Sequence, residues 1–212
     1  MPVSKRRSQG KKIAIAVFAS GNGSNFEAIA RRIKQKKLHG ARIKLLITDK
    51  EHAYVRVRAK KYQVKDIFVD PKKFKDRVAF DKKIAGILID EGIDLVVLAG
   101  FMRILSPYFV NKFRHRILNI HPALLPAFKG EDSIKRAYHY GVKVTGVTVH
   151  FVDTHVDHGP IVLQQSLEVK SQDSLDALEE KIHRIEHNLY PRAIDLFIKG
   201  KLAIKGRRVQ II

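Results

Sequence analysis

The sequence predicts an α/β fold, in which a doubly wound, mostly parallel sheet carries an antiparallel extension in the C-terminal half. Two observations lead to this prediction. Apolar segments alternate with segments of helical spacing along the first half of the chain, which is typical of helices packed on a parallel sheet. In the second half, two segments of strand character are separated only by a polar loop, as in an antiparallel pair.

The first half is interpreted as alternating strands and helices. The segment 12–19 is apolar almost throughout, as expected for a parallel strand that is buried on both faces. A helix follows it, because Phe26, Ile29 and Ile33 recur at helical spacing. The next elements are a strand at 42–48, a helix at 55–62, a short strand at 67–69, a helix at 74–91 and a strand at 94–99.

The second half combines further strands with one long helix. The segment 143–152 alternates between a mixed and an apolar face, and 161–169 is a second strand after a polar loop. The apolar spacing of 174–199 predicts a long helix. The other predicted elements are a strand at 117–121, a helix at 133–140 and a tail of strand character at 202–212.

Composition narrows the class of protein. The 212 residues include no cysteine, which excludes disulfides, thiolate metal sites and a cysteine nucleophile. No apolar run approaches the ~20 residues that cross a bilayer, and the N-terminus lacks the apolar segment of a secretory signal. We interpret residues 1–11 as a flexible basic arm and 12–212 as a single domain. The lack of cysteine fits a reducing compartment, so a cytoplasmic location is predicted.

The net charge of +20 permits two interpretations. A basic surface could bind nucleic acid, or it could steer anionic small molecules toward the protein. The lysines and arginines are scattered in pairs over predicted helices, and no aromatic-interleaved RNA motif is present. We therefore expect small-molecule substrates, and we do not expect specific nucleic-acid binding.

A glycine-containing loop follows the first predicted strand. The segment 20–25 reads SGNGSN and leads into a helix. Glycines let the backbone approach a ligand, and the N–H groups at the start of a helix point toward an anion. The loop is neither a Walker A motif nor a dinucleotide fingerprint, because no Gly-Lys-Ser/Thr follows and Phe26 occupies the third glycine position. The sequence therefore favours a site for a single phosphate over a plain strand-to-helix turn.

Two polar side chains share one face of the predicted strand 117–121. Residues two apart in a strand point the same way, so Asn119 and His121 project side by side. Their N–H groups could stabilise a developing oxyanion. Local evidence alone favours a simpler interpretation, in which Asn119 caps a turn and His121 is a hydrogen-bonded core histidine.

Two further segments have candidate ligand-binding residues. Met102, Ile104 and Leu105 follow the predicted strand 94–99, at the edge of the sheet where α/β proteins bind ligands, and they could line a pocket for a flat ring or simply pack in the core. The segment 155–158 reads HVDH. It lacks a clear third and fourth ligand, and the chain has no HExxH motif, so no metal site is predicted.

These motifs, in this order, resemble those of the phosphoribosylglycinamide formyltransferases, a family of folate-dependent enzymes of purine synthesis. The resemblance extends over nearly the whole chain after about residue 12. It rests on the SGNGSN loop and on LAGFMRIL at 98–105, LNIHP at 118–122, VHFVD at 149–153 with the residues up to Pro160, and EH at 186–187 with Tyr190-Pro191.

The resemblance implies an enzyme that transfers the formyl group of 10-formyltetrahydrofolate, its co-substrate, to the amine of glycinamide ribonucleotide, without a metal. It implies a nucleotide-binding half at 12–100 and a folate-binding and catalytic half at 101–212. The trio Asn119, His121 and Asp157 would be catalytic, with His150 beside it. Gly23, Ser24 and Asn25 would hold the phosphate and Glu186 the ribose or glycinamide end, while Arg77, Met102, Arg103, Ile104, Leu105, Asn119 and the loop 152–157 would border the folate.

Other functions stay open at this point. Another formyl-folate enzyme is the closest alternative, although a methionyl-tRNA formyltransferase would be expected to carry a C-terminal tRNA-binding domain and a formyltetrahydrofolate deformylase an N-terminal regulatory domain. A basic nucleic-acid-binding α/β protein is the alternative from a different class. Asp132 and His158 depart from residues that are frequent in relatives. A homodimer is compatible with the sequence.

Overall fold

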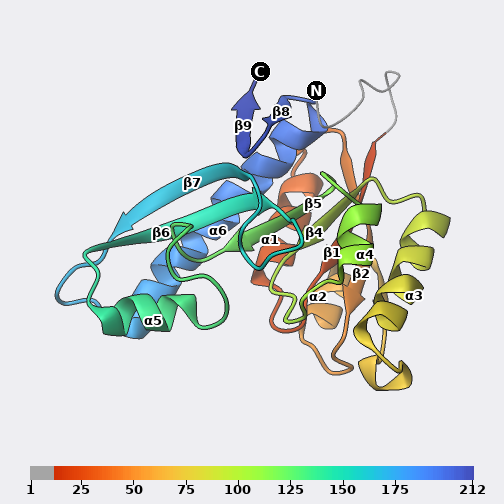
Figure 1. Ribbon diagram of the computed structural model, residues 1–212, viewed down its shortest axis with the longest axis horizontal. Coiled ribbons are helices and arrows are strands. Elements are labelled where there is room, and N and C mark those ends of the chain that lie inside the picture. Colours follow the sequence, from red (N-terminus) through yellow and green to blue (C-terminus); the bar gives the residue numbers. More distant parts are fainter. Residues whose placement is uncertain (1–11) are drawn as a thin grey trace.

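The computed structural model describes residues 12–212, so the predicted arm at 1–11 lies outside the described residues. In the described part, a nine-stranded sheet runs in the order β3-β2-β1-β4-β5-β6-β7-β9-β8 (Figure 1). The strands from β3 to β5 are parallel, whereas β6 is antiparallel to both β5 and β7. The predicted fold class, a doubly wound and mostly parallel sheet with an antiparallel extension, is thereby confirmed.

The first half follows the predicted alternation. Each apolar run forms a strand whose side chains are buried on both faces in the centre of the sheet, as parallel strands require. The predicted helix at 74–91 begins later, because the Asp76 side chain accepts a hydrogen bond from the Ala79 N–H at 2.7 Å and caps the helix there. The elements are β1 Ile13–Phe18, α1 Ser24–Lys34, β2 Ala41–Thr48, α2 Val55–Lys61, β3 Lys65–Phe68, the 3₁₀ turn Pro71–Lys73, α3 Arg77–Asp90 and β4 Leu95–Leu98.

The second half adds one helix that the sequence analysis missed. Helix α4, Pro107–Lys112, has only 6 residues, too few for its apolar spacing to repeat. Its signal was the pair Ser106-Pro107, since serine caps a helix and proline suits its first turn. The other elements are β5 Ile117–His121, α5 Ser133–Tyr140, β6 Val144–Phe151, β7 Ile161–Glu168, α6 Leu175–Ile198, β8 Leu202–Lys205 and β9 Arg208–Ile211.

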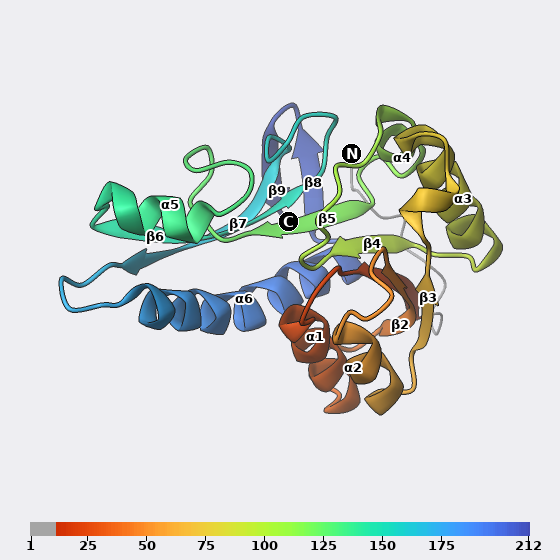
Figure 2. The same cartoon turned by 90° about the horizontal axis from the view of Figure 1, so that it is seen from below.

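Helices cover both faces of the parallel half of the sheet. Helices α1, α2 and α6 lie on one face, and α3 and α4 on the other (Figure 2). Two apolar clusters correspond to these faces: one contains Phe26, Ile29 and much of α6, and the other contains Phe80, Ile84 and Phe109. No helix among the described residues combines the length and apolar character that crossing a membrane requires.

Helix α6 is joined to the sheet beside the predicted site by Tyr190. This side chain is fully buried, and its hydroxyl lies 2.8 Å from the carbonyl oxygens of both Leu98 and Leu118. These carbonyls belong to β4 and β5, directly before Ala99 and Asn119. One buried hydroxyl thus links the long helix to the adjacent strands β4 and β5.

We expect Tyr190→Phe to lower the free energy of unfolding by about 1–3 kcal/mol, because the one hydroxyl proton that the two carbonyls share is lost. Urea unfolding followed by circular dichroism measures this change. Tyr62→Phe is a matched control, since the Tyr62 hydroxyl reaches only Glu27, at 3.4 Å and near the surface. Equal stability of Tyr190→Phe and the parent would show that the bridge contributes nothing to the fold.

Candidate active site

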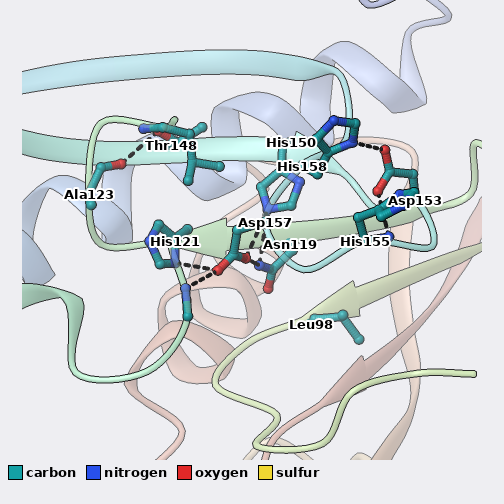
Figure 3. A network of polar contacts seen from close by, with 12 residues as sticks. Leu98, Asn119, His121, Ala123, Thr148, His150, Asp153, His155, Asp157 and His158 are labelled. Carbon is teal, nitrogen blue, oxygen red and sulfur yellow. Dashed lines mark hydrogen bonds and ion pairs between the residues drawn. The ribbon is translucent and has the colours of Figure 1, made fainter. Parts of the chain in front are cut away.

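The predicted trio assembles where β5 meets the loop after β6. Asn119 and His121 lie on the same face of β5, as the period of a strand requires. Antiparallel pairing places Asn119 opposite His150 and His121 opposite Thr148. The loop 152–158 follows β6; within it, Asp157 has a positive φ of 45° and its carboxylate contacts both side chains. Figure 3 shows Asp157 between Asn119, His121 and His150.

Asp157 is the centre of this polar network. One carboxylate oxygen lies 3.3 Å from His121 Nδ1, and the other accepts a hydrogen bond from the Asn119 amide at 3.3 Å and lies 3.6 Å from His150 Nε2. Burial raises the pKa of Asp157, but the nearby His150 imidazole, the hydrogen bond from the Gly130 N–H and the charge of His121 together outweigh it and lower the pKa. The carboxylate is therefore ionised at neutral pH.

Burial lowers the pKa of His121 below its ordinary value, and the opposing effect of Asp157 does not compensate for it. The side chain is almost completely buried, which is why the cost of desolvation dominates. Both ring nitrogens nevertheless face acceptors, Asp157 at Nδ1 and the Phe128 carbonyl at Nε2 at 2.9 Å. A proton gained during a reaction would be held between them.

The turn after β5 closes over the trio through two backbone groups. The Phe128 carbonyl contacts His121, and the Gly130 N–H donates to Asp157 at 2.8 Å. The start of the turn is fixed by the Thr148 hydroxyl, which donates to the Ala123 carbonyl at 2.7 Å. A substrate that hydrogen-bonds to His121 Nε2 must displace the Phe128 carbonyl, so the segment 122–132 is part of the site. No sequence motif pointed to these contacts, because they come from main-chain atoms.

The glycine loop lies at the carboxyl end of β1. Gly23 has a φ of 77°, and a Cβ there would lie 2.3 Å from Val55 Cγ2, so only glycine fits. No side chain caps helix α1, which leaves the N–H groups of its first turn available to an anion. The candidate phosphate residues Gly23, Ser24 and Asn25 therefore occupy a helix start that is open to a ligand.

Glu186 reaches this helix start from α6. Its carboxylate is almost completely buried and accepts hydrogen bonds from Asn25 Nδ2 at 3.0 Å and from His183 Nδ1 at 2.9 Å. The other amide atom of Asn25, Oδ1, is buried without a protein partner. The resemblance named Glu186 as a ligand-binding residue, and in the structure its carboxylate lies beside the glycine loop. Residues from both halves of the chain thus form this part of the site.

Arg58 supports the glycine loop from α2 and was not recognised in the sequence. Its Nε and Nη2 donate at 2.9 Å to the backbone carbonyl and the side-chain oxygen of Asn22. It also forms an ion pair with Glu27 and stacks on the Tyr54 ring, 5.0 Å from its centroid. Because no regular spacing links α2 to the loop, only the tertiary structure reveals this contact.

We expect Arg58→Ala to raise the KM for the ligand of the glycine loop about tenfold, which corresponds to ~1.4 kcal/mol, because the loop loses two charge-assisted hydrogen bonds. Arg56→Ala is the matched control. Arg56 lies on the same helix but binds Asp66 at 2.6 Å and the Glu51 carbonyl at 2.5 Å. Steady-state kinetics of the two variants make the comparison. An equal effect of both would mean that only the net charge matters.

The residues expected to border the folate lie around the end of β4. Met102 and Ile104 are exposed, at 64% and 59%, whereas Leu105 is buried. The Arg103 guanidinium stacks on Phe80, with 4.8 Å between Cζ and the ring centroid. Asn119 lies on the neighbouring strand β5. Arg77 is an exposed residue at the start of α3. Exposed apolar side chains thus follow β4, the strand that pairs with β5.

Comparison with known proteins identifies the class of protein that has this fold and this arrangement of polar side chains. The family model for the formyl transferases matches residues 13–194. The chain belongs to this family and is an enzyme of the formyltransferase class.

The most similar relatives include phosphoribosylglycinamide formyltransferase of Bacillus subtilis (strain 168), which is 42% identical over 179 residues, covering 84% of this chain and 91% of that protein. The crystal structure of glycinamide ribonucleotide transformylase 1 from Symbiobacterium toebii superposes with a TM-score of 0.93 at 42% identity, over the full length of both chains. The human trifunctional purine biosynthetic protein adenosine-3 is 40% identical over 194 residues, which are 92% of this chain but 19% of that protein.

Proposed function

We propose that the chain transfers the formyl group of 10-formyltetrahydrofolate to the amine of glycinamide ribonucleotide, giving formylglycinamide ribonucleotide and tetrahydrofolate in de novo purine synthesis. The observation that carries this proposal is the placement, in one sheet, of an open helix start after β1 and of the trio formed by Asn119 and His121 on β5 with Asp157 from the loop after β6; β4 alone separates β1 from β5. The phosphate of one small molecule could bind at the helix start while its reacting group lies at the trio. The names of the relatives support the same substrates.

At the ribonucleotide end, Gly23, Ser24 and Asn25 hold the phosphate through main-chain N–H groups at the start of α1. Glu186 receives the ribose or glycinamide end. It is buried beside Asn25, whose Oδ1 has no protein partner and remains available to a ligand hydroxyl or ammonium group. Two hydrogen-bond acceptors, the Glu186 carboxylate and Asn25 Oδ1, thus lie beside the phosphate site and favour a ligand that has donor groups next to its phosphate.

At the folate end, Met102 and Ile104 present exposed apolar surface for the flat ring, while Arg77 offers a positive charge for an anionic tail. The proposed folate site is completed by Leu105, Arg103 and the loop 152–157. The exposed fraction of Met102 and Ile104 supports this assignment, because large apolar side chains that are exposed together tend to mark binding surfaces. The folate acts as a co-substrate, and no step requires a metal.

The chemistry follows from the residue types. The amine attacks the formyl carbon, and negative charge develops on the formyl oxygen. Asn119 and His121 donate hydrogen bonds to that oxygen once the substrate has displaced their present partners. Asp157 stabilises the protonated form of His121 and passes a proton from the amine toward the folate nitrogen through water. The formyl carbon exchanges one C–N bond for another, and no covalent enzyme intermediate forms.

A formyl-transfer assay with glycinamide ribonucleotide and 10-formyl-dideazafolate tests the proposal, with the absorbance of the deformylated folate as the readout. We expect product only when the ribonucleotide is present. Product formed without it would indicate a deformylase, and product formed only with initiator methionyl-tRNA would indicate a tRNA formyltransferase. Tight binding of duplex DNA at physiological salt, without formyl transfer, would favour the nucleic-acid-binding alternative.

We further propose that the enzyme acts in the cytoplasm on small molecules, and that its high positive charge steers its anionic substrates rather than binding nucleic acid. The charges on its surface are dispersed over several helices, which suits steering of small anions. The chain acts as one formyltransferase domain over residues 12–212. Residues 12–100 supply most ribonucleotide contacts and 101–212 supply the trio, with Glu186 crossing from the second part to the first.

A further inference from the structure

The loop after β6 carries a cluster of ligand-type side chains that the trio does not use. Asp157 turns inward to the trio, whereas Asp153, His155 and His158 gather on the outer side of the same loop, as Figure 3 shows. One potential donor atom from each of these three residues lies within 4.8 Å of the other two. In the HVDH segment the acidic residue is Asp157, but in the structure the carboxylate that lies beside His155 and His158 is that of Asp153.

The loop is held in place at both ends, so the cluster is presented by a fixed frame. The Phe151 N–H donates to the Pro160 carbonyl at 2.9 Å. Gly159 approaches the Phe151 carbonyl so closely that a Cβ would lie 1.8 Å from that oxygen. A loop closed this tightly loses little conformational freedom when it binds a ligand.

The hydrogen bonds within the cluster leave donor atoms directed at one another. Asp153 Oδ1 accepts from the His155 N–H at 3.0 Å, which fixes the carboxylate, while Asp153 Oδ2 lies 2.7 Å from His158 Nδ1. The two imidazole rings are neighbours, with centroids 5.1 Å apart. A proton now lies between Asp153 and His158. A metal ion could take its place, because carboxylate and neutral imidazole are both metal ligands.

A positively charged side chain, Arg207, contacts the His158 member of the cluster. Its Nη1 lies 3.2 Å from His158 Nδ1 and 2.9 Å from Nε2. A donor that lay in the ring plane, on the lone pair of one ring nitrogen, would be far from the second ring nitrogen. Arg207 Nη1 is at similar distances from both nitrogens, so it lies over the face of the His158 ring. The in-plane lone pairs, which a metal would use, are therefore not taken by Arg207. Its Nη2 donates instead to the His158 carbonyl at 2.7 Å.

We propose that Asp153, His155 and His158 bind a divalent transition-metal ion such as Zn²⁺, with water in the fourth position. Two imidazoles and one carboxylate suit Zn²⁺, Co²⁺ or Ni²⁺ better than Mg²⁺ or Ca²⁺, which prefer oxygen ligands. Ligand atoms around a tetrahedral ion at ~2.0–2.1 Å stand wider apart than the present Asp153–His158 contact, so these two side chains separate on binding. The site shares its loop with Asp157 but uses none of the atoms of the trio.

Titration of the protein with Co²⁺, followed by visible absorption, tests the proposal, and Zn²⁺ titration calorimetry gives the affinity. We expect one ion per chain and the intense visible bands of tetrahedral Co²⁺, which Zn²⁺ abolishes by competition. Binding should weaken from pH 7.5 to pH 5.5, because the ion must displace a proton from the ligands. Asp153→Asn and His155→Ala should each weaken Zn²⁺ binding by at least ~10–100-fold.

His183→Ala is the matched control, because His183 also faces a carboxylate, Glu186, at 2.9 Å and is partly exposed. It should leave the affinity and the Co²⁺ spectrum unchanged. Each variant is checked by thermal unfolding, and Asp153→Asn keeps an oxygen acceptor for the His155 N–H, so the loop can retain its shape. Unchanged affinity in both Asp153→Asn and His155→Ala, an octahedral Co²⁺ spectrum, or loss of binding in His183→Ala would overturn the proposal.

Discussion

Asn119→Ala should lower kcat by about 10²–10³-fold and change the KM of either substrate little. Loss of one donor to a developing oxyanion costs ~2.7–4 kcal/mol of transition-state stabilisation. Asn119 lies in the middle of β5, with its amide nitrogen 3.3 Å from Asp157 and 3.1 Å from His150. Asn119 can therefore stabilise negative charge on the substrate oxygen only after that oxygen has replaced Asp157 or His150 as the partner of its amide N–H. Steady-state kinetics with both substrates varied measure the effect.

Asn111→Ala serves as the control for this variant, since Asn111 is an exposed residue of α4. It should leave kcat unchanged. A loss in Asn119→Ala that falls on KM rather than on kcat would assign Asn119 to substrate binding, because an interaction made only in the transition state lowers kcat.

Asp157→Asn should lower kcat by a comparable or larger factor, about 10²–10⁴-fold, and should also change the pH dependence. Burial already lowers the pKa of His121, and Asp157 is the strongest influence that raises it. Without that negative charge the pKa of His121 falls further. Protonated His121 is lost as the pH rises through its pKa. The limb of the pH–rate profile that descends toward high pH should therefore move to lower pH.

An NMR titration of His121 beside the pH–rate profile separates the electrostatic role of Asp157 from a structural one. Asparagine keeps an oxygen acceptor for the Gly130 N–H, which Asp157 binds at 2.8 Å, so the turn over the trio can stay closed. If the pKa of His121 is the same in the variant and the parent, Asp157 is not its electrostatic partner. His150, 3.6 Å from Asp157, would then be the next residue to test.

Those parts of the fold and site that depend on local patterns could be predicted from the sequence. The pairing of Asn119 and His121 on one face follows from the two-residue period of a strand, and the open helix start follows from the glycine loop. The strands and long helices were recognised for the same reason, because apolar residues recur along them many times. The short helix α4 offered no such repetition.

The remaining parts depend on contacts between segments that are distant in the sequence. Arg58 reaches Asn22 across 36 positions, and no pattern within α2 distinguishes it from Arg56. The Phe128 carbonyl and the Gly130 N–H act through the backbone, so their side chains gave no signal. The direction of the His121 pKa shift also required the structure, because burial is a property of the packed molecule, whereas the neighbouring charge of Asp157 could be inferred from the resemblance.

The hydrogen bond between Asn25 and Glu186 has a consequence for the order of folding. The two residues are 161 positions apart, and β1 acquires its second neighbour only when β4, far along the chain, has been made. Contacts of such long sequence separation form late, because large loops must close first. A growing chain that has completed β1, α1 and β2 therefore carries the glycine loop without the acidic partner that α6 supplies. Affinity for a ribonucleotide should appear in one step, when the last long helix docks, rather than accumulate as the chain lengthens.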